Sequence, residues 1–194
     1  MDVVGLVERA QHGDVNAFDG LVDLYSDRAL KVAYLITGSQ SVAEEAVQET
    51  FIICYTKIKQ LRSPQTFEAW FYQTLTRQSW RCARKEKSVI SLDEMRDQGR
   101  EAALEDLHVA DLLANKELEH LLQLALKRLT LPLRTTVVLR YYNDLSIKEI
   151  AQVLDTQEGT VKSRLHSANQ QLAAELRRLG WVMAGQENNQ SKTA

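Results

Sequence analysis

The sequence is poor in cysteine, proline and glycine. Its 194 residues include two cysteines, two prolines and eight glycines. Cys54 and Cys82 lie 28 positions apart with no partner motif, which disfavours a disulfide scaffold or a cysteine-rich zinc site and fits a reducing cytoplasm. So few chain breakers also argue against an all-β fold, which needs many turns.

Long hydrophobic runs and a targeting segment are also missing. The longest wholly apolar stretches, such as residues 51–55, have about five residues, far short of the roughly 18 residues that suggest a membrane span. The opening Met1-Asp2-Val3 lacks the basic start and apolar run of a secretory signal. We therefore expect a cytoplasmic protein without direct membrane insertion.

Charge is nearly balanced in total but unevenly distributed. The formal net charge is −2, and 44% of the residues are hydrophobic, which is typical of a globular protein. Residues 88–119 carry nine acidic and three basic side chains, whereas residues 120–185 carry five acidic and nine basic ones. An acidic middle thus separates two halves, and the basic segment is suited to nucleic acid.

Hydrophobic spacing predicts helix almost throughout the chain. Asp14 is a candidate cap for a helix that ends at Gly38, and residues 41–44 resemble a capping box for a second helix. Another helix follows the Ser63-Pro64 turn, and a later one has Pro132 in its first turn. This later helix carries Val137, Val138, Leu139, Tyr141 and Tyr142. The pattern predicts an all-α fold.

Composition divides the chain into two small helical domains. We expect the first over residues 1–87 and the second over residues 116–184. Between them, residues 88–115 form an acidic linker with some helical content, and the polar residues 185–194 form a flexible tail.

Residues 145–172 predict a helix-turn-helix. Ser146 and Glu149 form a capping box for a short first helix, and Asp155 or Thr156 is expected to cap the second. Val161 would face inward, so the second helix exposes hydrogen-bonding and cationic groups suited to base edges and phosphates. These groups are Thr160, Lys162, Ser163, Arg164, His166 and Ser167. The alternative is an ordinary helical hairpin with a solvated polar face.

Two polar helix faces stand out in the first half. Trp70, Arg77, Arg81 and Arg84 share one face by their spacing, and aromatic rings among arginines can stack on unpaired bases and follow a phosphate backbone. The alternative is a core helix with solvated basic residues. An earlier face contains Glu44, Glu45, Gln48 and Glu49, which taken alone is typical of a solvated surface.

The chain resembles the RNA polymerase sigma factors of the extracytoplasmic-function (ECF) group. Residues 43–51 (AEEAVQETF) are similar to the helix by which that family binds the polymerase clamp. Residues 67–87 are similar to its −10 helix, and residues 131–142 with 158–166 (EGTVKSRLH) to the domain that binds the −35 element.

The resemblance implies a function, partners and site residues. The protein would bind core RNA polymerase and promoter DNA, with an anti-sigma factor as a further partner. The implied polymerase-binding residues are Glu44, Glu45, Gln48, Glu49 and Phe51. The implied −10 residues are Lys57, Arg62, Trp70, Arg77, Arg81 and Arg84, and residues 57–66 resemble the loop that captures a flipped base. The implied −35 residues are the six polar residues of the second helix of the helix-turn-helix.

The sequence departs from the family pattern at three places. Arg77 and Arg81 stand where the −10 helix usually has Asn and Asp. Asp155 stands where the turn usually has Gly, and a left-handed residue there would cost about 1 kcal/mol relative to Gly. Ser167 and Asn169 replace a basic string, so we expect weaker and more polymerase-dependent −35 binding.

The sequence contains no set of residues with the spacing of a known catalytic motif. His12, His108, His120 and His166 are scattered, and no glycine-rich phosphate loop occurs. We therefore expect no enzyme activity, metal, cofactor or small-molecule substrate. The competing function is a stand-alone helix-turn-helix regulator with a ligand or dimer domain in its first half, which would bind operator DNA without polymerase.

Overall fold

The computed structural model describes residues 2–94 and 116–179, and all the regular elements in these two ranges are helical. The first range contains α1 (Val3–Gln11), α2 (Val15–Thr37), α3 (Gln40–Lys57), η1 (Ile58–Gln60), η2 (Pro64–Thr66) and α4 (Phe67–Glu94). The second contains α5 (Lys116–Arg128), α6 (Leu131–Val137), η3 (Val138–Tyr142), α7 (Ile147–Val153) and α8 (Glu158–Arg178). The expected all-α fold is confirmed. The expected tail and residues 95–115 of the expected linker lie outside the described ranges.

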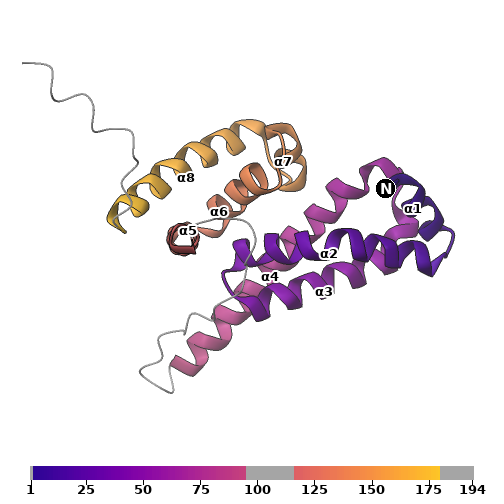
Figure 1. Ribbon diagram of the computed structural model, residues 1–194, viewed down its shortest axis with the longest axis horizontal. Helices are drawn as coiled ribbons and strands as arrows, with labels where there is room; N and C mark the ends of the chain where they lie inside the picture. Colours follow the sequence, from indigo (N-terminus) through magenta and orange to yellow (C-terminus); the bar gives the residue numbers. More distant parts are fainter. Residues whose placement is uncertain (1, 95–115, 180–194) are drawn as a thin grey trace, which may run out of the picture.

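Helices α2, α3 and α4 lie side by side as an elongated bundle, and α1 folds over one end of it (Figure 1). Aromatic rings form the centre of this bundle. The Tyr25 ring lies 4.9 Å from Phe71 and 5.6 Å from Phe67, measured between centroids. Such tilted and edge-on contacts add to the free energy gained by burying the rings, which ties α2 firmly to α4.

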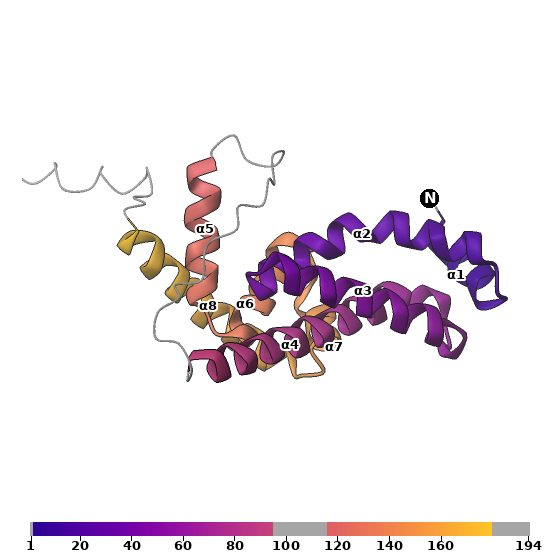
Figure 2. The same ribbon diagram turned by 90° about the horizontal axis from the view of Figure 1, so that it is seen from below.

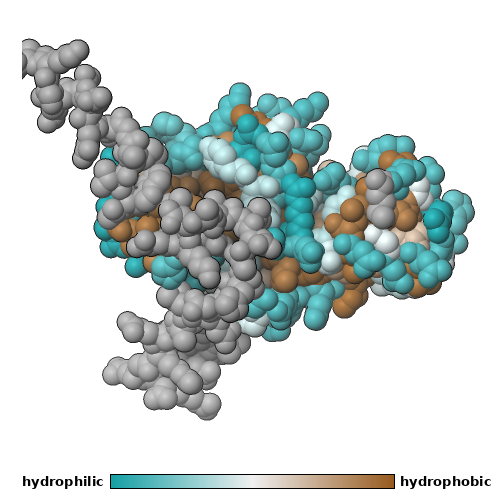
Figure 3. All heavy atoms as spheres, in the orientation of Figure 1, coloured by the Kyte–Doolittle hydropathy of each residue, from teal (hydrophilic) through white to brown (hydrophobic). Residues whose placement is uncertain are grey.

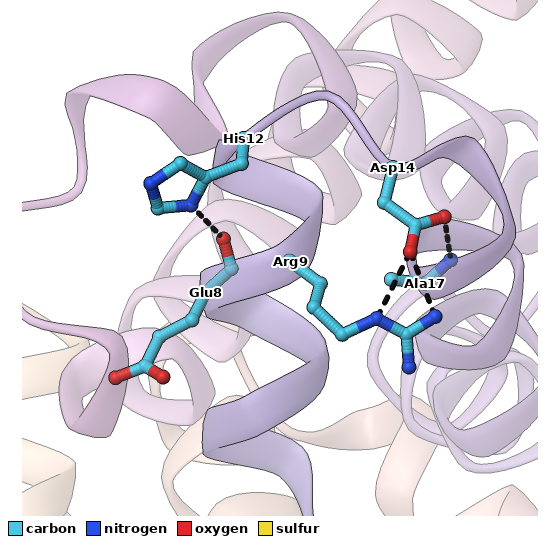
Figure 4. A network of polar contacts seen from close by, with 5 residues as sticks. All are labelled: Glu8, Arg9, His12, Asp14 and Ala17. Carbon is cyan, nitrogen blue, oxygen red and sulfur yellow. Dashed lines mark hydrogen bonds and ion pairs between the residues drawn. The ribbon is translucent and has the colours of Figure 1, made fainter.

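The turn between α1 and α2 is fixed by Asp14, as the sequence predicts. Its carboxylate accepts a hydrogen bond from the Ala17 amide at 3.2 Å and pairs with Arg9 at 2.7 Å (Figure 4). The hydrogen bond from Arg9, followed by that from the Ala17 amide, lowers the pKa of Asp14 below its ordinary value. The predicted stop at Gly38 is also confirmed, since this residue has the left-handed φ of 77° that favours glycine.

Two predicted helix starts are wrong. The sequence predicts a capping box at residues 41–44, but α3 begins at Gln40 with Ser39 as its N-cap. The Ser39 side chain does not cap the helix, and its hydroxyl donates to Glu86 of α4 at 3.1 Å. Helix α8 is preceded by Gln157 as N-cap, because Asp155 is the left-handed turn residue and Thr156 donates its amide to Ala151. In both places tertiary or turn geometry, rather than the local motif, decides where the helix begins.

The helix-turn-helix is formed by α7 and α8. The predicted capping box at its start is complete, since the Ser146 amide donates to Glu149 at 2.8 Å and the Glu149 amide to Ser146 at 3.3 Å. Ala151 and Val161 are buried where the two helices meet. Asp155 has a φ of 49°, so the turn is left-handed there, as expected.

The two halves pack against each other. Helix α4 contacts α7, and α2 contacts α6 and η3, and the two views agree in placing α7 beside α4 (Figure 2). One hydrophobic cluster includes Phe71 and Leu75 of the first half with Leu139 and Ile150 of the second. Helix α4 also continues to Glu94, so the first seven residues assigned to the linker are helical.

Candidate functional site

The acidic face of α3 is partly engaged by α4. Glu44 and Gln48 are exposed, whereas Glu45 and Glu49 are half-buried. Lys85 donates to Glu45 at 2.9 Å, and Arg81 lies 3.2 Å from Glu49. The Glu44 carboxylate accepts a hydrogen bond from the Gln40 side chain on the same helix. The face therefore presents two exposed polar side chains, Glu44 and Gln48, and two carboxylates that already have cationic partners.

Exposed apolar side chains extend this face beyond the residues that the sequence suggests. Ile52, four residues after Gln48, is 60% exposed, and Tyr55 is 54% exposed. Hydrophobic residues gather over α3 along the lower edge of the bundle, among hydrophilic ones (Figure 3). The spacing of four from Gln48 is the signal that could have identified Ile52. Phe51, in contrast, turns inward and lies 5.4 Å from the Phe71 ring.

The basic face of α4 separates its cations from its aromatic rings. Three arginines on this face are exposed, namely Arg77, Arg81 and Arg84. Trp70 is half-buried against the Phe67 ring at 6.0 Å. Cations are therefore accessible along the helix, while only part of the Trp70 ring is available for stacking.

Two further cations flank the start of α4. Lys57 ends α3, and Arg62 lies in the connection between η1 and η2. Both residues are exposed. The connection is anchored from α1, where the side-chain amide of Gln11 donates to the backbone carbonyls of Ile58 and Leu61 at 3.0 and 2.7 Å. This fixes the backbone beneath the two basic side chains.

The second half approaches the same face of α4. Trp80 donates its indole N–H to the Thr135 hydroxyl at 2.8 Å, and Gln73 donates to the Gln152 carbonyl at 3.4 Å. Arg77 lies 4.0 Å from Asp155 in the turn of the helix-turn-helix. The sequence gives no sign of these contacts, which bring the two candidate DNA-binding elements together.

Helix α8 has the buried apolar side and the exposed polar side that the sequence predicts. Val161 is fully buried, while Lys162, Ser163 and His166 are exposed. Thr160, Arg164 and Ser167 are half-buried beside them. The Ser163 hydroxyl donates to the Thr160 carbonyl at 2.9 Å, so its oxygen remains available as an acceptor. One side of the helix therefore presents a continuous polar surface.

Candidate chemistry of other kinds finds no support in the described ranges. There, no group of three or more His, Cys, Asp or Glu residues could hold a metal ion, and His108 lies outside them. Both cysteines are free and buried, and burial raises the pKa of the Cys54 thiol to about 12, so it is a poor nucleophile. The described helices also include none with the length and hydropathy of a membrane span.

Two family models match the chain in order. Sigma-70 region 2 matches residues 21–89, and Sigma-70 region 4 matches residues 119–172. The chain is 30% identical over 179 residues to the ECF RNA polymerase sigma factor SigW of Bacillus subtilis, covering 89% of this chain and 96% of SigW. It is also 30% identical over 182 residues to the ECF RNA polymerase sigma-E factor of Haemophilus influenzae, covering 86% and 91% of the two chains.

Solved structures agree in fold. CnrH, solved in complex with the cytosolic domain of CnrY, is similar with a TM-score of 0.66 and 19% identity over 91% of this chain and 97% of CnrH. The sigma factor RpoE of Bartonella quintana, solved with the anti-sigma factor NepR, has a TM-score of 0.65 and 19% identity over 82% and 96% of the chains. Because both regions are present and the 30% identity to SigW extends over 89% of the chain, the chain belongs to the ECF group of RNA polymerase sigma factors, which direct RNA polymerase to promoters to initiate transcription.

Proposed function

We propose that this chain acts as the non-catalytic promoter-specificity subunit of RNA polymerase, in the cytoplasm, with a separate surface for each task. Helix α3 would dock on the polymerase, α4 and the connection before it would contact the −10 element, and α8 would contact the −35 element. The observation that supports this most is the juxtaposition on one bundle of an acidic, partly apolar face on α3 and a cationic face on α4.

The docking surface would consist of Glu44, Glu45, Gln48, Glu49 and Ile52. An exposed isoleucine surrounded by polar groups matches the apolar centre and polar rim of protein interfaces. The acidic members favour a basic partner surface. Phe51, which faces the aromatic core, would support α3 from behind rather than contact the polymerase.

The −10 surface would follow the exposed cations. Lys57 and Arg62 lie before α4, and Arg77, Arg81 and Arg84 lie along it. Guanidinium and ammonium groups spaced along a surface suit successive phosphates of a strand. The exposed part of Trp70 would supply the stacking surface for an unpaired base.

The −35 surface would be the polar side of α8. A recognition helix presents its first turns to base edges in the major groove. Arg164 suits a guanine edge, whereas Lys162 suits a phosphate. Thr160, Ser163, His166 and Ser167 would complete this surface with hydrogen-bonding groups.

Control by an anti-sigma factor is part of the proposal. Two proteins of similar fold were solved in complex with partners, the cytosolic domain of CnrY and the anti-sigma factor NepR. A helical partner that covers α3 or α4 would block docking and promoter contact together, because the two faces are adjacent on one bundle.

Transcription from a promoter library by core polymerase, with and without the chain, tests the proposal. We expect initiation only with the chain, and a loss of about tenfold or more at −35-dependent promoters for Arg164→Ala, with relaxed preference at particular bases. Asp23→Ala, at an exposed position of α2, is the control for a surface substitution. Operator binding by the chain alone, with no effect on polymerase, would instead indicate a stand-alone regulator.

A further inference from the structure

Tyr141 is an exposed aromatic residue with a fixed hydroxyl. Tyr141 lies in η3 and is 63% exposed. Its hydroxyl oxygen accepts a hydrogen bond from the Asn169 side-chain amide at 3.0 Å. Along the π-helical turn of η3, Val138 and Leu139 are buried while Tyr141 faces solvent.

The partner of Tyr141 places it at the end of the polar surface of α8. Asn169 follows His166 by three residues and Lys162 by seven, so the three side chains lie on one side of the helix. All three residues are exposed. Since a recognition helix enters the groove with its first turns, its later turns pass beside the phosphate backbone. The Tyr141 hydroxyl is therefore positioned for a phosphate rather than for a base edge.

The hydrogen bond from Asn169 also orients the hydroxyl. A phenol oxygen has one hydrogen to donate, and the amide of Asn169 occupies a lone pair. The hydroxyl hydrogen is left for a separate acceptor. Tyrosine is among the side chains that donate to DNA phosphates.

The chemistry of the neighbouring segment gives such a contact a role. From Ser167 to Leu176 the chain carries no cation, so the middle turns of α8 lack charged phosphate anchors, and the next cations are Arg177 and Arg178 in its last turn. We propose that Tyr141, held by Asn169, donates a hydrogen bond to a backbone phosphate of the −35 element and serves as an uncharged anchor there. This inference rests on the proposed function of α8 as the DNA-contacting helix.

Salt dependence separates an uncharged anchor from a cationic one. We expect Tyr141→Phe to weaken binding of the holoenzyme to −35-containing DNA about tenfold, since it removes one hydrogen bond to a charged group. The slope of log affinity against log salt should not change, because a neutral donor releases no counterion. Lys162→Ala should instead reduce that slope by about one. Tyr142→Phe, which removes the hydroxyl of a half-buried neighbour, is the matched control and should bind as the unaltered protein does.

A phosphate scan locates the contact. Methylphosphonate substitution at one −35 phosphate should weaken binding of the unaltered protein and should have no further effect on Tyr141→Phe. Asn169→Ala should weaken binding less than Tyr141→Phe, and adding it to Tyr141→Phe should change little.

Several outcomes would overturn the inference. The first two are an unchanged DNA affinity in Tyr141→Phe and a loss of affinity that depends on base identity. The third is an equal loss of affinity in Tyr142→Phe. The fourth is that the losses from methylphosphonate and from Tyr141→Phe add at every phosphate position. If Lys162→Ala and Arg164→Ala are also without effect, the assignment of α8 fails as well. If those two variants bind poorly while Tyr141→Phe does not, only the phosphate anchor is wrong.

Discussion

Arg81 of α4 lies 3.2 Å from Glu49 of α3, and one turn away Lys85 lies 2.9 Å from Glu45. The two antiparallel helices thus share a short ladder of ion pairs that joins the proposed DNA-contacting face to the proposed docking face. Exposed pairs of this kind contribute only about 0–1 kcal/mol each. Either a polymerase surface or a DNA phosphate can therefore take one partner at little cost to the fold.

Arg81→Gln tests this weakness. We expect the free energy of unfolding to change by less than about 1 kcal/mol, since the pair is exposed. Promoter binding by the holoenzyme should weaken, and its log–log salt slope should fall by about one, because one cation is lost. Arg9→Gln removes an arginine from a comparable exposed pair on α1 and should leave promoter binding unchanged. An unchanged salt slope for Arg81→Gln would exclude it from the phosphate contacts.

Ile52→Ala tests the apolar centre of the docking face. We expect core-polymerase affinity to fall about tenfold, as for a residue at the centre of an interface, with little change in stability because the side chain is already exposed. Val15→Ala is the matched control, an equally apolar residue that is 54% exposed at the start of α2. Affinity can be measured by titrating labelled protein with core enzyme.

The charged part of the same face has its own test. Glu45→Lys combined with Gln48→Ala should weaken core binding without unfolding the chain, since neither residue is in the hydrophobic core. If this double variant bound core polymerase as tightly as the unaltered protein, α3 would not be the docking helix, whatever the result for Ile52.

Local sequence patterns predict the parts of the fold that neighbours along the chain determine. The Asp14 cap, the Gly38 stop and the Ser146 capping box each depend on contacts within a few residues. The bond from Trp80 to Thr135 joins residues 55 positions apart, and no periodicity signals it. Long-range packing of this kind also decides which polar side chains are covered, so the candidate faces could be predicted but not their mutual contacts.

Cleavage between the halves tests the proposed two-domain organisation. We expect limited proteolysis to cut within about residues 88–115 and to leave two resistant helical fragments, because the composition changes there and each flanking half has its own apolar pattern. The fragments should elute together, since the hydrophobic cluster includes residues from both. A single resistant core that spans residue 100 in the absence of a partner would contradict the proposed division.

Arg134→Ala tests the polar junction between the halves. The half-buried guanidinium donates to the carbonyls of Ile36, Lys127 and Leu129 at 2.9, 2.7 and 3.1 Å. Losing it leaves carbonyls at the end of α2, in the last turn of α5 and just after α5 without this donor, so we expect a loss of about 2–3 kcal/mol in the free energy of unfolding. Arg128→Ala, at an exposed position of α5, is the control in urea unfolding. Equal stability of the two variants would show that the junction contributes little.

Asp155→Gly tests the backbone strain in the helix-turn-helix. A φ of 49° is unfavourable for a residue with a side chain, although aspartate adopts it more readily than most. Glycine removes that strain but gains freedom in the unfolded chain, so we expect a net stabilisation of at most about 1 kcal/mol, whereas Asp155→Ala should destabilise by a similar amount. The lost ion pair with Arg77 contributes little, since it spans 4.0 Å between exposed groups. Asp144, with a φ of 56° before α7, is the matched position, and its Gly and Ala variants should differ in the same order. If Ala and Gly at position 155 were equally stable in urea unfolding, the left-handed turn would carry no strain.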